Sequence, residues 1–317
     1  MDREVTGLMD GVVDVDGGEL ALAVRPGERQ DSPVVLLIHG ITASSRSFLA
    51  LERVLPGMRL LAPDLRGRGR SSVLPGPYGL ERHADDLRQV LDAAGADRVT
   101  VVGHSMGGFV ATLLAAAEPE RVASVVLVDG GLPLAAPPGV DVSDPRVLGP
   151  VFARLTRVFP SREAYQAFWR EAPAFAAPGA FTDDVADYVD YDLVPVDGGF
   201  RPSANPEAVA TDQAQQYGAA FHLDALRALR QPVRFLRAPL GLQADPPGLY
   251  APDRARGFAE LVPQIRVTEV PEVNHYTVLM TSPGVDTVAA AVLGAVAEIR
   301  THLDDAPHAR GNTARMT

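Results

Sequence analysis

The sequence contains neither cysteine nor lysine. Without cysteine the chain cannot form disulfides, thiolate metal sites or cysteine nucleophiles. All 29 of its basic residues are arginine, which also excludes chemistry that depends on a lysine amine. No apolar run reaches the length of a membrane span, and the N-terminal stretch has no apolar signal core. We therefore predict a cytoplasmic protein that is not inserted in a membrane.

The charge balance narrows the range of partners. The chain has 40 acidic and 29 basic residues, a formal net charge of −11. A surface of this sign argues against binding to nucleic acid or to an anionic membrane. Its 317 residues, 46% of them hydrophobic, can form one large domain or two ordinary ones with ample core. No motif indicates a cofactor or a metal site, and a small molecule is the partner that we expect.

The most informative stretch is a strand, a sharp turn and a helix centred on Ser105. A β-branched apolar run at 99–102 leads into Gly103-His-Ser105-Met-Gly107, and apolar residues at helical spacing follow. Gly103 and Gly107 have no Cβ, so the strand and the helix can approach closely. Ser105 would also lie at a helix N-terminus, where free N–H groups favour a developing anion. This context predicts an exposed, nucleophilic serine.

The rest of the chain alternates strand and helix signals. Such alternation predicts a doubly wound α/β sheet. The expected elements are an antiparallel hairpin at 8–25, strands at 33–38, 59–62, 122–128, 233–238 and 265–270, and helices at about 80–95, 253–261 and 285–302.

Residues 132–221, here called the inserted segment, differ from their surroundings. Strand signals are absent, prolines are frequent, and the segment holds 12 of the 19 aromatic residues. We predict a helical cap over the active edge of a core formed by residues 1–131 and 222–303, and a disordered tail at 304–317. The expected cap helices lie at about 146–158, 161–171, 182–192 and 206–218. The aromatic residues expected to line the cleft are Phe152, Phe168, Trp169 and Tyr188.

Four motifs in a fixed order resemble the α/β-hydrolase family. They are His39-Gly-Ile41, Asp64-Leu-Arg-Gly-Arg-Gly-Arg-Ser71, Gly103-His-Ser-Met-Gly-Gly108 and Asn274-His275. The resemblance covers about residues 8–131 and 222–302. It implies an eight-stranded, mostly parallel sheet, a Ser–acid–His order along the chain and an active site beneath the cap. It also implies that His39 braces the loop that stabilises the oxyanion.

The residues themselves suggest roles that agree with this resemblance. Ser105 would be the nucleophile, and a serine hydroxyl needs an adjacent base to attack a carbonyl. His275, in a loop after the last expected strand, would be that base. The backbone N–H groups of Met106 and Ile41 would form the oxyanion hole. No catalytic role is expected for His104.

The third member of the triad has two candidates. The family usually places its acid a few residues after the strand expected at 233–238. In the loop that follows, the only carboxylate is Asp245, which lies later than usual. Asp129 instead ends the strand after the nucleophile helix, a position that some members of the family use. We favour Asp129 and keep Asp245 as the alternative.

A serine nucleophile excludes the dehalogenases and epoxide hydrolases of the family, which need a carboxylate. We predict a serine hydrolase that cleaves a hydrophobic carboxylic ester through an acyl-enzyme, because the cap is aromatic and has no basic cluster. Its arginines are expected on a solvated face: Arg146, Arg154, Arg157, Arg162 and Arg170. The alternatives are a carbon–carbon bond hydrolase of ring-cleavage products, a thioesterase or lactonase of secondary metabolism, a cofactor-free haloperoxidase and a ligand-sensing receptor.

Overall fold

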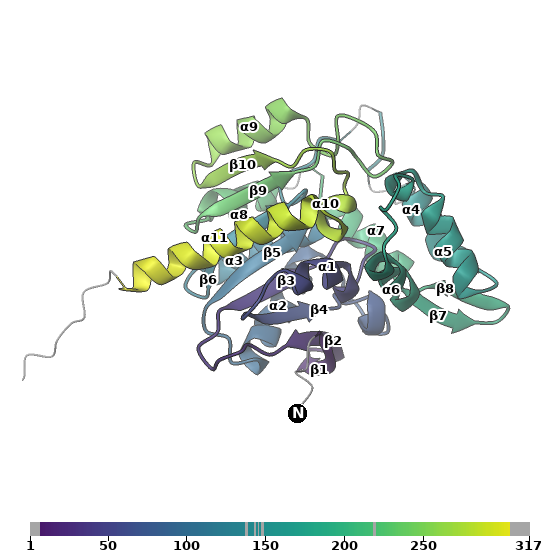
Figure 1. Cartoon of the computed structure of the whole chain (residues 1–317), viewed down its shortest axis with the longest axis horizontal. Coiled ribbons are helices and arrows are strands. Elements are labelled where there is room, and N and C mark those ends of the chain that lie inside the picture. The colour runs from purple at the N-terminus through teal and green to yellow at the C-terminus, as the bar shows by residue number, and fades with distance from the viewer. Residues whose placement is uncertain are drawn as a thin grey trace, which may run out of the picture.

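An eight-stranded sheet in the order β1-β2-β4-β3-β5-β6-β9-β10 runs through the centre of the molecule (Figure 1). The computed structural model describes residues 7–304 except 137, 138, 143, 145, 147, 148, 218 and 219. The strands are β1 (Met9–Val15), β2 (Gly18–Arg25), β3 (Val34–Ile38), β4 (Arg59–Pro63), β5 (Val99–His104), β6 (Val122–Val128), β9 (Val233–Arg237) and β10 (Ile265–Glu269). Within this sheet, β2 pairs antiparallel with β1 and β4, and the other neighbouring strands pair parallel. The predicted doubly wound, mostly parallel sheet is confirmed.

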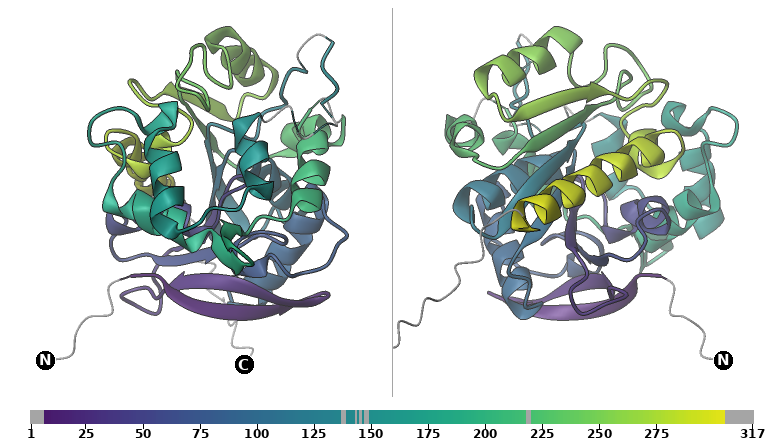
Figure 2. Two further views of the ribbon diagram at one scale, coloured as in Figure 1. Left: turned by 90° about the vertical axis from the view of Figure 1, so that its right-hand side faces the viewer. Right: turned by 60° about the vertical axis from the view of Figure 1, so that its left-hand side comes forward.

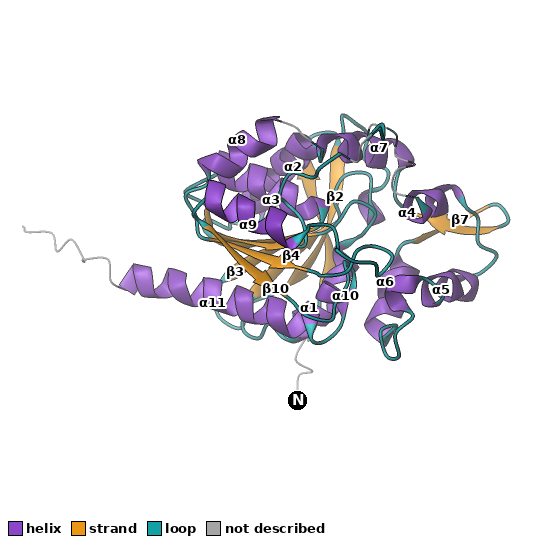
Figure 3. Ribbon diagram, turned by 90° about the horizontal axis from the view of Figure 1, so that it is seen from above, coloured by secondary structure: helices purple, strands orange, loops and turns teal. Residues whose placement is uncertain are grey.

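Helices cover both faces of this sheet (Figure 3). One face carries α2 (Leu80–Ala93), α3 (Met106–Ala117), α8 (Ala220–Ala228) and α9 (Pro252–Leu261), and the other carries α1 (Leu49–Arg53), α10 (Thr277–Met280) and α11 (Gly284–Asp304). Alternate side chains of β3 enter the two cores: Leu36 packs in the first, and Val35 and Leu37 pack in the second. Strands buried on both faces are continuously apolar, and the sequence therefore showed them clearly.

The inserted segment lies beyond one edge of the sheet, where the carboxyl ends of the strands meet (Figures 1 and 2). It contains α4 (Pro150–Ala153), α5 (Arg162–Arg170), α6 (Asp183–Tyr191) and α7 (Pro206–Gln215). The helix expected at 146–158 is shorter, because a 3₁₀ turn (Arg154–Thr156) follows α4. The tail predicted to be disordered lies, after Asp304, outside the described residues.

The expectation that the inserted segment holds no strands is wrong. β7 (Leu193–Val196) and β8 (Gly199–Pro202) form an antiparallel hairpin. Its turn is Asp197-Gly198, with Gly198 at φ +84°. Asp-Gly is a strong signal for a two-residue hairpin turn, and it outweighs the prolines around it.

No helix in the part of the chain that the structure describes has both the length and the hydrophobicity that a membrane span requires. The cytoplasmic location stays a prediction.

β5, the following turn and α3 touch each other through their backbones. Ser105 adopts φ 54° and ψ −125°, a region that L-residues rarely occupy. A Cβ on Gly107 would overlap the carbonyl oxygen of Ile38, and a Cβ on Gly103 would overlap that of Gly107. The turn is therefore held by contacts that only glycine permits.

Replacing Gly107 by alanine should thus destabilise the fold. We expect Gly107→Ala to lower the free energy of unfolding by about 3 kcal/mol or more, because backbone atoms must move apart. Gly257→Ala is a matched control in α9, where a Cβ meets nothing within 4 Å. This control should raise stability by up to about 1 kcal/mol. Urea unfolding measures both, and equal stabilities of the two variants would contradict the close-packing argument.

Candidate active site

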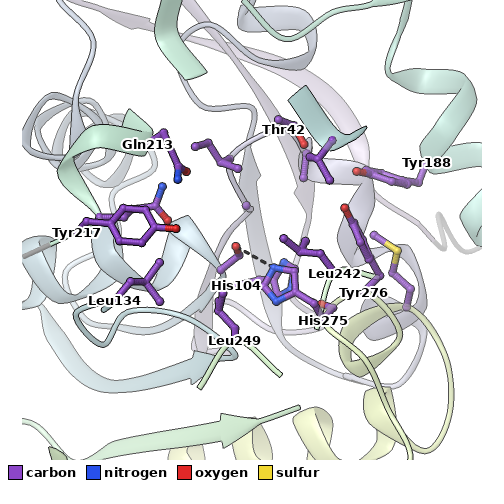
Figure 4. A pocket seen from close by; sticks show the side chains of 17 residues that line it. Thr42, His104, Leu134, Tyr188, Gln213, Tyr217, Leu242, Leu249, His275 and Tyr276 are labelled. Atoms are coloured by element: carbon purple, nitrogen blue, oxygen red, sulfur yellow. Dashed lines mark hydrogen bonds between the residues drawn. The ribbon is translucent and has the colours of Figure 1, made fainter. Parts of the chain in front are cut away.

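The structure brings Ser105, His275 and Asp129 together at the carboxyl edge of the sheet. His275 Nε2 lies 2.9 Å from Ser105 Oγ, the bond drawn as a dashed line in Figure 4. On the other side of the ring, His275 Nδ1 lies 2.7 Å from Asp129 Oδ2. Asp129 is completely buried and His275 is 4% exposed. A hydroxyl, an imidazole and a carboxylate in this order can activate the hydroxyl as a nucleophile.

The second carboxylate oxygen of Asp129 is bonded to the backbone of Ala238. Asp129 Oδ1 accepts the N–H of Ala238 at 3.1 Å, so both carboxylate oxygens have a partner. Asp245, the alternative acid, is exposed, and its backbone carbonyl accepts the N–H of Gly241. Because the Nδ1 atom of His275 is already bonded to Asp129, the geometry favours Asp129 over Asp245.

Two further histidines support the loops around the nucleophile. His104 Nε2–H donates to the carbonyl of His275 at 2.8 Å, and burial lowers its pKa to about 3. His39 Nδ1–H donates to the carbonyl of Gly40, while its Nε2 accepts the N–H of Leu65. His39 therefore contacts the loop as the resemblance implied. The contact of His104 with the His275 loop was not expected, because a residue beside the nucleophile gives no sequence signal for it.

The two expected oxyanion donors lie on either side of Ser105. Met106 is the first residue of α3, where an α-helix provides no acceptor for its N–H. Ile41 follows Gly40, and a Cβ on Gly40 would lie 3.1 Å from the Cβ of Ser105. Both backbone segments thus lie beside the serine, and their role as oxyanion donors stays a prediction.

A cavity of about 70 Å³ opens directly over the serine. Figure 4 shows Gln213 and Tyr217 on one side of it, facing Tyr188 and Tyr276 on the other. The Nε2 atom of Gln213 is buried without a hydrogen-bond partner. Burial raises the pKa of Tyr276 to about 12, so its hydroxyl stays protonated at neutral pH. The cavity is therefore apolar with a few polar groups, as small-molecule sites usually are.

A second cavity of about 310 Å³ adjoins the first and shares Val151, Leu242 and Tyr276 with it. Of the predicted cleft-lining aromatics, Tyr188 lines the cavity over the serine, and Trp169 and Phe168 line this second cavity.

The prediction for Phe152 is corrected. Its side chain packs against the core cluster that contains Leu134 and Leu155. It lines neither of these two cavities.

Arg154 is a second correction, because it is not part of a solvated face. It is 2% exposed and donates to the carbonyl and Oγ1 of Thr42 at 3.2 and 3.1 Å. Asp192 balances its charge at 3.2 Å, and the ring of Trp169 lies 5.1 Å from its Cζ. Sequence spacing could not show this burial, because the countercharge lies 38 residues away.

Among the described residues, no group of three or more histidine, aspartate or glutamate side chains is arranged to hold a metal ion.

The bond between Asp129 and His275 generates a direct test. Asparagine at position 129 can donate to Nδ1 and so favours the wrong imidazole tautomer. We expect Asp129→Asn to slow the labelling of Ser105 by a fluorophosphonate by about 10⁴-fold. Asp245→Asn is the matched control and should label like the wild type. The opposite pattern would assign the acid to Asp245.

Three buried histidines predict a loss of stability in acid. Burial lowers the pKa of His39 and His222 to about 4 and that of His104 to about 3. In the unfolded chain they titrate near pH 6.5. Between these pKa values the three histidines are protonated in the unfolded chain but not in the folded one. Their contribution to the free energy of unfolding is therefore fully present above pH 6.5 and is lost as the pH falls. Each of these histidines lowers the free energy of unfolding by up to about 1.4 kcal/mol per pH unit in this interval.

Urea unfolding at pH 7.5 and pH 5 measures this loss. The variant His222→Gln, which can still donate to the carbonyl of Gly131, should lose less stability than the wild type over the same interval. An equal loss in both proteins would show that His222 is not buried in its neutral form.

Comparison with known proteins agrees with this geometry. A family model described as alpha/beta hydrolase fold matches residues 33–189. A 2-(acetamidomethylene)succinate hydrolase of Mesorhizobium japonicum is 28% identical over 83% of this chain and 87% of that protein. The crystal structure of an E-2-(acetamidomethylene)succinate hydrolase superposes with a TM-score of 0.73 and 25% identity, covering 92% of this chain and 99% of that one.

A further relative matches over a shorter stretch. Lipase LipV of Mycobacterium tuberculosis is 44% identical over 100 residues, which are 32% of this chain and 38% of the lipase. The family model, the eight-stranded sheet and the shared architecture lead to one conclusion. The chain is a hydrolase that belongs to the α/β-hydrolase fold family.

Proposed function

We propose that the protein is a serine hydrolase that cleaves a carboxylic ester through an acyl-enzyme. The observation that carries this proposal is the pair of hydrogen bonds that joins Ser105, His275 and Asp129 at the floor of a lined cavity. These three groups are the machinery that acyl transfer to serine needs.

In the proposed reaction, Ser105 Oγ attacks the ester carbonyl while His275 Nε2 takes its proton. The N–H groups of Met106 and Ile41 bind the oxyanion of the tetrahedral intermediate. His275 then gives the proton to the leaving alkoxide, and the alcohol departs. Water repeats the sequence on the acyl-enzyme, with His275 as base, and releases the acid. Asp129 holds the imidazole in the tautomer that both steps require.

The cavity walls support an ester with apolar substituents. Seven of the lining residues are aliphatic or methionine: Ile41, Ala43, Leu134, Val151, Leu242, Leu249 and Met280. The space over the serine is small, so we assign it to a short substituent. The larger cavity past Tyr276, lined by Trp169 and Phe168, would hold the longer one. The match to a lipase over 100 residues points to the same class.

A second candidate substrate is one that carries a carboxylate. Two relatives support it by name: the 2-(acetamidomethylene)succinate hydrolase, and a putative 2-succinyl-6-hydroxy-2,4-cyclohexadiene-1-carboxylate synthase of Bacillus subtilis, 30% identical over 49% of this chain and 56% of that protein. Arg154 also lines the second cavity. Because Asp192 already balances its charge, this arginine offers hydrogen bonds but no net positive charge. We therefore place the uncharged ester first.

Two substrates of similar length decide between these candidates. We expect p-nitrophenyl butyrate to be hydrolysed about tenfold or more faster than mono-p-nitrophenyl succinate, because the carboxylate of the latter would be buried without a countercharge. The measurement is kcat/KM, extended to esters from acetate to palmitate. Ser105→Ala should abolish turnover of all of them.

Faster hydrolysis of the succinate would favour the second candidate. If the folded wild-type protein neither turns over an ester nor reacts with a fluorophosphonate, the proposal fails. Many turnovers per molecule would in turn exclude a purely ligand-sensing role.

A further inference from the structure

Arg68 is a completely buried cation in the Gly-rich loop after β4. Its Nε–H donates to the carbonyl of Ile41 at 2.9 Å, and an Nη2 donor lies 3.9 Å from the sulfur of Met106. Its Nη1 donates to the carbonyl of Arg66 at 3.0 Å. One guanidinium thus contacts the two residues whose N–H groups are the proposed oxyanion donors.

The countercharge of Arg68 comes from the inserted segment. Asp212 of α7 lies 2.5 Å from Arg68 Nη1, and both side chains are completely buried. His83 Nε2 lies 2.8 Å from the same carboxylate oxygen. Burial favours the protonated form of Asp212, but Arg68 and His83 prevail and lower its pKa. The pair is therefore ionised, and it joins a loop of the core to a helix 144 positions later in the chain.

α7 is also attached to the core at both of its ends. At its start, the N–H of Asn205 donates to the carbonyl of Gly67 at 2.8 Å, and a Cβ on Gly67 would lie 2.6 Å from the Cβ of Ala208. At its end, Gln215 Oε1 accepts the N–H of Leu80 at 2.7 Å. The pair of Arg68 and Asp212 lies between these attachments.

The same helix forms one wall of the cavity over the serine. Gln213, which follows Asp212, lines that cavity (Figure 4). The route from the cavity wall to the oxyanion loop is therefore short: from Gln213 to Asp212, through the ion pair to Arg68, and on to the carbonyl of Ile41. Each link is a covalent bond or a hydrogen bond of the described residues.

We propose that Arg68 and Asp212 are positioning residues that set the oxyanion loop and the α7 wall at the separation that the transition state requires. This inference rests on the proposed function, since Ile41 and Met106 are donors only if an oxyanion forms. A fixed carbonyl at Ile41 limits rotation within that residue and so orients its N–H. A guanidinium is suited to this task because its rigid fork reaches several acceptors at once, whereas an ammonium does not.

A matched ion pair in the same loop provides the control. Arg66 Nε and Nη2 donate to the two carboxylate oxygens of Asp86 at 2.8 and 2.9 Å, and both side chains are buried. The other acceptors of Arg66 are the carbonyls of Pro75 and Asp16. Asp86→Asn therefore removes a buried countercharge as Asp212→Asn does, but away from the contacts to Ile41 and Met106.

The experiment compares Asp212→Asn, Asp86→Asn and the wild type by Tm, by kcat and KM for p-nitrophenyl butyrate, and by inhibition with phenylboronic acid. The boronate forms a tetrahedral adduct on serine and so reports on the oxyanion hole. For Asp212→Asn we expect kcat to fall by between about 10- and 100-fold, a matching rise in the boronate inhibition constant and little change in KM. Asp86→Asn should lower the Tm similarly and leave kcat near that of the wild type.

Hydrogen exchange of the peptide that covers residues 40–44 gives a readout independent of activity. Exchange there should be faster in Asp212→Asn and unchanged in Asp86→Asn. Unchanged exchange and kcat in folded Asp212→Asn would overturn the inference, as would an equal loss of kcat in both variants. A wild-type protein without esterase activity, by contrast, would refute the proposed function. The hydrogen exchange of residues 40–44 would still test whether the pair of Arg68 and Asp212 fixes the loop. If Asp212→Asn does not fold, Arg68→Lys must show the same kcat and exchange effects.

Discussion

The buried carboxylate of Asp129 is the point on which the candidate active site depends. One oxygen binds the imidazole of His275 and the other binds the backbone at Ala238, directly after β9. The backbone N–H of Asp129 donates to the carbonyl of Leu236 in β9. Three segments distant in sequence are therefore fixed relative to one another by a single aspartate. A buried carboxylate is tolerated here because both of its oxygens have partners.

The inserted segment meets this arrangement in two physically different ways. On one side aromatic rings are in contact: the ring of Trp169 lies 5.6 Å from that of Tyr276, which follows His275. The buried pair of Arg154 and Asp192 lies beside Trp169 on this side. On the other side α7 is attached through a buried ion pair and backbone hydrogen bonds. The cavity over the serine lies between these two sides.

The sequence predicted those features that local patterns encode. The central strands β3, β5 and β6 are almost continuously apolar because they are covered on both faces. The turn at Ser105 is marked by glycines because its close backbone contacts leave no room for a side chain. Asp129 could be favoured over Asp245 because the end of β6 neighbours the end of β5. What sequence could not show depends on partners far along the chain. Arg154 is buried because Asp192 and Thr42 contact it. Phe152 is partly buried against a core cluster that its helical spacing does not identify.

These two kinds of contact, aromatic packing and buried ion pairs, have a consequence for how this chain can change over evolutionary time. Aromatic contacts such as those around Trp169 tolerate many apolar replacements that conserve volume. A buried ion pair tolerates few, because the loss of one partner leaves an uncompensated charge. We therefore expect natural variants of this chain to change at apolar positions such as Phe168, while the two buried pairs, Arg68 with Asp212 and Arg154 with Asp192, are each inherited as one unit.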